Sequence, residues 1–211
     1  MGQPATVRTA AQHRRDRGMA GVAGNEKLTA MTGSVLLIGF AAEGLTIIGV
    51  HRFLFLHFVI GFLLIGPVLL KIASTLYRFL RYYSGSQSYV RKGPPNPILR
   101  VLGPIVILTS VGVIGSGVML GVLGPGRGGL WLFLHKGCFV LWFGAMTVHV
   151  LTHAPRLPAM LSARYTSDSG RVTAVPGGAV RWLLLAASLA AGVGVAALAM
   201  QLSSGWGLGG L

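Results

Sequence analysis

Five long stretches of the chain consist almost wholly of apolar residues, and short polar or glycine- and proline-rich segments separate them. The apolar stretches cover about 28–50, 53–80, 101–123, 130–152 and 182–202. A helix that crosses the hydrocarbon of a bilayer needs about 20 such residues. The pattern therefore predicts an all-α integral membrane protein with five transmembrane helices.

The composition agrees with this pattern. Of 211 residues, 53% are hydrophobic and only 10% are charged, and the mean hydropathy is +0.69. Soluble domains carry about 25% charged residues, and disordered chains are poor in apolar ones, so both classes are excluded. The single cysteine, Cys138, allows no internal disulfide framework.

The net charge of +14 would suggest nucleic acid binding in a soluble chain, but the position of the charges indicates a topology. Fourteen basic residues lie in the first 27 residues and in the second-to-third and fourth-to-fifth connections, against two, Arg52 and Arg127, on the opposite side. Cytoplasmic segments of membrane proteins carry an excess of Lys and Arg. We therefore expect a cytoplasmic N-terminus, an outer C-terminus and no nucleic acid partner.

With this topology the chain divides into four parts. Residues 1–27 are expected to form a polar and mobile cytoplasmic tail. Residues 28–155 form a four-helix transmembrane domain, and 156–181 form a basic cytoplasmic loop. Residues 182–211 form the fifth helix and a short outer tail.

Two histidines are predicted to lie at the same depth in the membrane. His57 follows Phe53 by four residues and His135 follows Trp131 by four, near the outer ends of two spans that run in the same direction. At a rise of about 1.5 Å per residue, both lie about one turn inside the outer boundary. Two imidazoles so placed could ligate one metal centre from opposite sides.

A third histidine, His149, lies 14 residues after His135, about 21 Å further along nearly the same helix face. Haem iron accepts an imidazole on each axial side, and two haems stacked through a membrane would need about this spacing. Gly61 and Gly144 could leave room for a flat porphyrin. Arg52, Arg127 and Lys136 lie near the outer boundary and could pair with haem propionates.

The segments "LHFVIG" around His57 and "WLFLHKGCFVLWFGAMTVHVLTH" around His135 and His149 resemble the haem-bearing helices of bacterial membrane cytochromes b. The group they resemble is the formate-dehydrogenase gamma-subunit and bacterial cytochrome b561-like superfamily. The resemblance covers residues 28–155 and leaves the fifth span and the tail unexplained. It implies a haem-binding four-helix bundle in the bacterial cytoplasmic membrane.

In that family, His57 and His135 would hold an outer haem b, and His149 would hold an inner haem with a partner from the first helix. The first span has no histidine and offers Met31 at that depth, while the second span offers Lys71. The sequence thus supports one haem and leaves the second open. Alternatively, His149 and His153 could bind zinc or copper at i,i+4 spacing. His149 could also pack as an ordinary interior residue, and His153 is expected at the membrane boundary, near headgroups or the helix C-terminus.

Two further ionisable residues lie inside the spans. Glu43 is the only acidic residue in any of them and lies near the depth of the expected haem. It could accept a proton beside a quinol pocket, bond a haem-ligating imidazole, or fix packing through an ion pair. Lys71 is expected to extend towards the cytoplasmic interface.

The function expected from these features is a b-type haem subunit that passes electrons between the quinone pool and a partner redox protein. By resemblance, that partner would be a molybdenum or iron–sulfur oxidoreductase. No nucleophile–base constellation, phosphate loop or nicotinamide fingerprint indicates a self-contained enzyme. Two alternatives stay open. One is a haem-free transporter or assembly scaffold whose histidines and Glu43 line a proton or metal path. The other is a haem-containing reductase of an extracellular acceptor.

Overall fold

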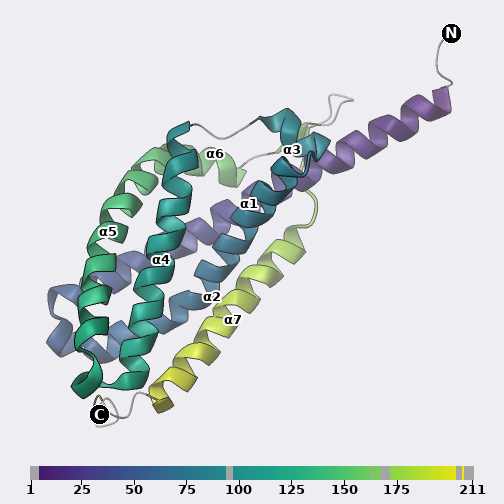
Figure 1. Cartoon of the computed structure of the whole chain (residues 1–211). Coiled ribbons are helices and arrows are strands. Elements are labelled where there is room, and N and C mark those ends of the chain that lie inside the picture. The colour runs from purple at the N-terminus through teal and green to yellow at the C-terminus, as the bar shows by residue number, and fades with distance from the viewer. Residues whose placement is uncertain (1–4, 94–96, 163, 167–171, 203–205, 207–211) are drawn as a thin grey trace.

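The computed structural model describes residues 5–93, 97–162, 164–166, 172–202 and 206 (Figure 1). The long helices are α1 (Ala5–Ile48), α2 (Val50–Tyr83), α4 (Pro97–Leu123), α5 (Gly129–His153) and α7 (Gly178–Leu202). The short elements between them are α3 (Gln87–Lys92), η1 (Pro125–Arg127), η2 (Ala154–Arg156), α6 (Leu157–Ser162) and the antiparallel strands β1 (Tyr165–Thr166) and β2 (Val172–Thr173). Among the described residues, five helices are long and apolar enough to cross a membrane, which confirms the predicted multi-pass helical architecture.

Helix α1 begins much earlier than expected. Its 44 residues span about 66 Å, and its N-terminal part projects beyond the other helices (Figure 1). Residues 5–27 were expected to be a mobile tail, but they continue the helix. They include no proline, and Val22 is almost fully buried. Glu26 also forms ion pairs with Arg78 of α2 and Lys92 of α3, at 3.4 and 2.6 Å. Tertiary contacts therefore hold the helix around Val22 and Glu26.

The helices form two groups, as Figure 1 shows. Helices α1, α2 and α7 pack closely together, and α4 and α5 form a hairpin beside them. Contacts between the groups are sparse and run chiefly from α4 to α2 and α7. Two apolar clusters centre on α2: one around Leu64, with Leu36 and Val68, and one around Phe58 and Phe62 against α7. The hairpin thus faces α1 and α2 across a loosely packed boundary.

The fifth membrane helix, α7, lies directly against α2. A Cβ added at Gly66 would overlap the backbone of Ser188, and one added at Gly192 would overlap the backbone of Leu63. Small residues let membrane helices approach this closely, and close packing is the main force that holds them together. Beyond the end of α7, the Trp206 indole N–H donates a hydrogen bond to the Leu120 carbonyl of α4, at 3.0 Å. Helix α7 is therefore an integral part of the bundle.

The α4–α5 hairpin turns at Gly124, whose φ of +74° is a conformation that glycine adopts without strain. Helix α4 faces α5 with small residues: Gly112 lies against the Cys138 sulfur, and Ser110 accepts a hydrogen bond from the Trp142 indole at 2.9 Å. No residue of α5 is buried in the described part of the chain. Much of its apolar surface is thus available to lipid.

Candidate metal centre

His57 and His135 come together between α2 and α5. Their ring centroids are 6.3 Å apart, and the ring planes are nearly perpendicular, at 87°. The two residues are 78 positions apart in the chain. They meet because α2 and α5 carry them to the same level, next to the turns that end α1 and α4. The structure therefore brings together the two histidines that the sequence places at equal depth.

Side chains of α1 fix the orientation of His57. Its Nδ1 lies 2.9 Å from Glu43 Oε1 and 2.9 Å from Thr46 Oγ1. The Thr46 hydroxyl lies 2.6 Å from the Glu43 carbonyl oxygen. A carbonyl oxygen only accepts, so the Thr46 hydroxyl donates its one hydrogen to it. The hydroxyl can then only accept a hydrogen bond from the imidazole. His57 Nδ1 must then carry a proton, and in the neutral ring the lone pair is on Nε2.

Helix α4 fixes His135 in the same way. Its Nδ1 lies 3.0 Å from the Val113 carbonyl and 3.2 Å from Ser116 Oγ. The Ser116 hydroxyl donates to the Gly112 carbonyl at 2.6 Å, so it too can only accept from the ring. His135 Nδ1 therefore carries the proton, which leaves the lone pair on Nε2 in the neutral ring. Both imidazoles are held in the tautomer that a metal binds through Nε2.

The spacing of the rings fits a single metal ion between them. A metal–imidazole bond is about 2.0 Å, and a ring nitrogen lies about 1.1 Å from its ring centre. Two imidazoles on opposite sides of one metal then have centroids about 6.2 Å apart, against the 6.3 Å found here. The Nδ1–H bonds to a carboxylate and a carbonyl are the outer contacts that orient metal-binding histidines. His57 and His135 are therefore the residues that would hold a haem iron, each through Nε2.

The Glu43 carboxyl belongs to an outer polar layer, which we define as His57, His135, Glu43, Thr46 and Ser116. Its Oε1 bonds His57, while its Oε2 is buried without a hydrogen-bond partner among the described residues. Gly61 of α2 faces it, and a Cβ at that position would lie 3.2 Å from Oε1. The contact with His57 fits two of the roles considered for Glu43, a hydrogen-bond partner of the imidazole and an ion pair that fixes packing. Gly61 makes room for this carboxyl.

The other residues proposed for a haem lie around this layer. Gly144 has open space where a side chain would start. Arg52, Arg127 and Lys136 are exposed near the same end of the bundle, and the Arg52 guanidinium lies 5.7 Å from the centre of the Phe53 ring. These three cations stay available to anionic groups there.

The inner part of the bundle holds a second group of ionisable residues. The His149 and His153 rings lie 4.5 Å apart, and His149 Nδ1 is buried without a hydrogen-bond partner among the described residues. Lys71 turns into the α1–α2 interface, where its ammonium donates to the Thr29 carbonyl at 2.6 Å. The expectation that Lys71 extends towards the cytoplasmic interface is thus wrong, because a backbone carbonyl in the bundle satisfies it. No second histidine pairs with His149 across the bundle in the part described.

An aromatic pair lies between the outer polar layer and an inner one, which consists of Lys71, His149 and His153. Phe40 of α1 and Trp142 of α5 meet edge to face, with ring centroids 4.8 Å apart. Phe40 lies three residues before Glu43, and Trp142 lies midway between His135 and His149. Between the outer and inner layers, α1 and α5 therefore meet through two aromatic rings.

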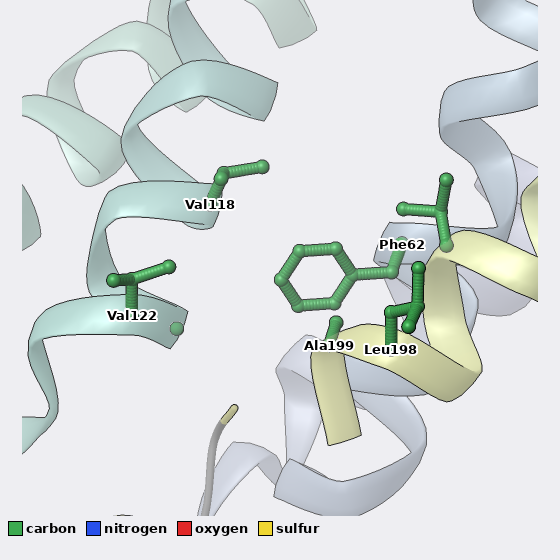
Figure 2. A pocket seen from close by; sticks show the side chains of 7 residues that line it. Phe62, Val118, Val122, Leu198 and Ala199 are labelled. Atoms are coloured by element: carbon green, nitrogen blue, oxygen red, sulfur yellow. The ribbon is translucent and has the colours of Figure 1, made fainter. Parts of the chain in front are cut away.

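A hollow in the described structure lies elsewhere, between α2, α4 and α7 (Figure 2). It measures about 170 Å³ and opens to the side of the bundle, and Phe62, Val118 and Leu198 are among its lining residues. Every lining residue is apolar, so it could hold hydrocarbon but has no group to orient a polar ring. The hollow therefore offers no metal ligand, and the candidate site is the one that His57 and His135 form.

Sequence reasoning missed the residues that orient the two rings. Thr46 and Ser116 are hydroxyl residues inside apolar spans, and each bonds a backbone carbonyl of its own helix. Thr46 lies one turn after Glu43, and Ser116 lies between two glycines. Polar residues beside small ones in a membrane helix are the signal that could have marked them.

No family model, curated protein or solved structure matches the chain. The site is therefore defined by its own geometry.

Proposed function

We propose that the chain is a b-type haem subunit of the bacterial cytoplasmic membrane. It passes electrons between the quinone pool and a partner redox protein. The observation that carries the proposal is the His57–His135 pair, with rings 6.3 Å apart and both Nδ1 atoms held by hydrogen bonds. Such a pair offers one nitrogen from each side to a metal ion between α2 and α5.

The number of ligands favours haem over a bare metal ion. Protein sites for zinc use three or four side chains, and no group of three or more His, Cys, Asp or Glu side chains gathers around a possible metal in the described residues. Haem iron already has four ligands from its macrocycle and needs only two more, which an imidazole pair supplies. The sparse contacts between the α4–α5 hairpin and α1 and α2 are where such a macrocycle would lie.

When bound, haem b supplies a one-electron carrier, and the chain supplies its ligands and surroundings. Glu43 and Thr46 hold His57, and Val113 and Ser116 hold His135. Arg52, Arg127 and Lys136 would bind the propionates at the exposed end.

The side of the membrane and the partner follow from the distribution of charge. The positive-inside rule places the N-terminus in the cytoplasm, and the histidine pair then lies near the outer surface. A redox partner on that side can exchange electrons with the centre over a short distance. The resemblance in sequence suggests a molybdenum or iron–sulfur oxidoreductase as this partner and a quinone as the carrier in the membrane.

The haem-free alternative is a proton or metal path, which would need a chain of polar groups through the bundle. The ionisable residues instead lie in two layers, and Phe40 and Trp142 pack between them. The Phe40–Trp142 contact interrupts such a chain where α1 meets α5. This packing favours an electron carrier.

The test is the reduced-minus-oxidised spectrum of the purified full chain, with the haem content per chain. A b-type α band and about one haem per chain are expected, and His57→Ala and His135→Ala should each abolish the normal six-coordinate spectrum. His51→Ala is the matched control, because His51 is exposed in the first turn of α2. The absence of a b-type band would refute the proposal, and an unchanged spectrum in either variant would refute the ligand assignment.

A further inference from the structure

We propose that the inner polar layer binds the phosphate of an anionic phospholipid, with Lys71 and His149 as its hydrogen-bond donors. The site lies between α2 and α5, in the leaflet on the same side of the membrane as α6. The positive-inside rule makes this the cytoplasmic leaflet. The inference needs no haem, so it goes beyond the proposed function and does not depend on it.

Lys71 and His149 lie at the depth of lipid phosphates. Lys71 follows His57 by 14 residues on α2, and His149 follows His135 by 14 residues on α5. Each is therefore about 21 Å beyond the histidine pair, and about 26 Å from the outer boundary, along its helix. The hydrocarbon of a bilayer is about 30 Å thick. Both residues thus lie near its inner boundary, where the headgroup region begins.

Lys71 carries a charge that no carboxylate neutralises. Its Nζ donates to the Thr29 carbonyl at 2.6 Å, and Gly33 leaves room for it, since a Cβ there would lie 2.8 Å from Nζ. An ammonium has three N–H donors, so two stay available. No ion pair among the described residues includes Lys71. An unpaired cation at this depth is costly, and a bound anion would stabilise it.

The histidines of α5 face this cation. His149 Nδ1 is buried without a hydrogen-bond partner among the described residues, and the His153 ring packs against the His149 ring, with centroids 4.5 Å apart. Lys71 is close enough to both rings to interact with them electrostatically. A neutral imidazole has one N–H to donate. A phosphate between α2 and α5 would therefore accept from the ammonium and from His149.

The surrounding charges favour a lipid with net negative charge. Arg78 and Arg156 also interact electrostatically with His153. Glu26 pairs with both Arg78 and Lys92, so this one carboxylate balances only one of the two cations. The remaining positive charge attracts an anionic headgroup and repels the ammonium of a zwitterionic one. Basic pockets between membrane helices on the cytoplasmic side are typical sites for anionic headgroups.

The apolar surroundings favour a lipid over a free phosphate ion. On the outer side of the layer, Phe40 and Trp142 pack together and offer no polar group to a phosphate that enters more deeply. At the other end, η2 and α6 lead from α5 back to α1, against which α6 packs (Figure 1). Val148 and Leu151 are exposed on α5 beside His149 and give acyl chains an apolar surface. A lipid therefore satisfies both parts of the site, whereas a phosphate ion satisfies one.

The test is lipid binding by the purified full chain, measured by native mass spectrometry in detergent. The chain is titrated separately with phosphatidylglycerol, phosphatidylethanolamine and inorganic phosphate. We expect one tightly bound phosphatidylglycerol per chain. The other two probes should bind about tenfold more weakly or less, because each lacks one feature that the site recognises.

Two variants assign the site to its donors. Lys71→Met keeps an unbranched side chain but removes the ammonium, and it should weaken phosphatidylglycerol binding about tenfold or more. His149→Phe keeps a ring and removes its N–H, and it should weaken binding about two- to tenfold. This second variant keeps the test decisive if Lys71→Met does not fold.

Lys27→Met is the matched control. Lys27 lies at the same end of the bundle, but on the face of α1 opposite Asn25 and Thr29, whose side chains contact Ser74 of α2. It should bind phosphatidylglycerol as the wild type does.

Each outcome bears on the proposal. Wild-type affinity in Lys71→Met and His149→Phe, or equal affinity for the two lipids, would overturn it. Inorganic phosphate that binds as tightly as phosphatidylglycerol would assign the site to a free anion and overturn the lipid. A chain without haem that keeps lipid binding dependent on Lys71 would refute the proposed function alone. A haem-bearing chain without such binding would overturn only this inference.

Discussion

The contact between α2 and α7 allows a prediction whose size follows from the structure. Gly192 lies so close to α2 that a Cβ there would be 3.0 Å from the carbonyl carbon of Leu63 and 3.3 Å from its Cα, and would overlap its carbonyl oxygen. Backbone atoms cannot rotate away as a side chain can. Gly192→Ala must therefore push the two helices apart.

The magnitude can be worked from these distances. Carbon atoms pack best at about 3.5–4.0 Å, so relieving the carbon contacts alone requires about 0.5–1 Å, and clearing the carbonyl oxygen requires more. A gap of about 0.5–1 Å already forfeits a quarter to a half of each contact's dispersion energy. Forced overpacking of this kind costs about 1–3 kcal/mol. No hydrophobic force between helices in lipid compensates, because lipid tails are as apolar as the side chains. We expect Gly192→Ala to destabilise the chain by this amount.

The assay is equilibrium unfolding of the purified chain in detergent, with Gly194→Ala as the matched control. Gly194 lies two residues further along α7, and nothing lies within 4 Å of the position that its Cβ would take. Both variants replace a helical glycine by alanine, so their intrinsic helix propensities change equally. The difference between them isolates the contact with Leu63. Equal unfolding free energies for the two variants would refute the reasoning about α7.

Two further predictions concern the α4–α5 hairpin. In Gly117→Ala the new Cβ would lie 3.1 Å from Cε1 of His135 and would displace the ring by a few tenths of an ångström. Haem affinity should fall up to about tenfold in a haem titration, while Gly115→Ala, with nothing within 4 Å, should bind as the wild type does. Trp142→Phe removes the indole hydrogen bond to Ser110 and should lower the free energy of unfolding by about 0.5–1.5 kcal/mol. The haem spectrum should not change. A loss of haem would contradict the assignment of Trp142 to packing between the helices.

Much of the fold could be predicted because hydropathy reports directly on membrane crossing. The five apolar stretches gave five helices, with boundaries within a few residues at most ends. The start of α1 was wrong because the helix continues through residues 5–27, and near Glu26 it is held by ion pairs with α2 and α3. Such contacts depend on which helices become neighbours, which hydropathy does not report.

The site could be predicted only in part. Equal depth of His57 and His135 follows from counting residues along helices of known rise. The partners of their Nδ1 atoms depend on how α1 and α4 are rotated about their axes, so Thr46, Val113 and Ser116 could not be foreseen. The contact between Phe40 and Trp142 requires the same knowledge. Lys71 was misplaced because a carbonyl of α1 lies within its reach.

The central claim is that His57 and His135 ligate one haem iron from opposite sides, and the electron paramagnetic resonance spectrum of the oxidised full chain tests it most directly. Two neutral imidazoles give a low-spin ferric haem, and ring planes at 87° predict the strongly anisotropic form of that signal. His57→Ala and His135→Ala should each convert it to a high-spin signal. A wild-type haem that is high-spin, or a low-spin signal that survives in both variants, would contradict the account.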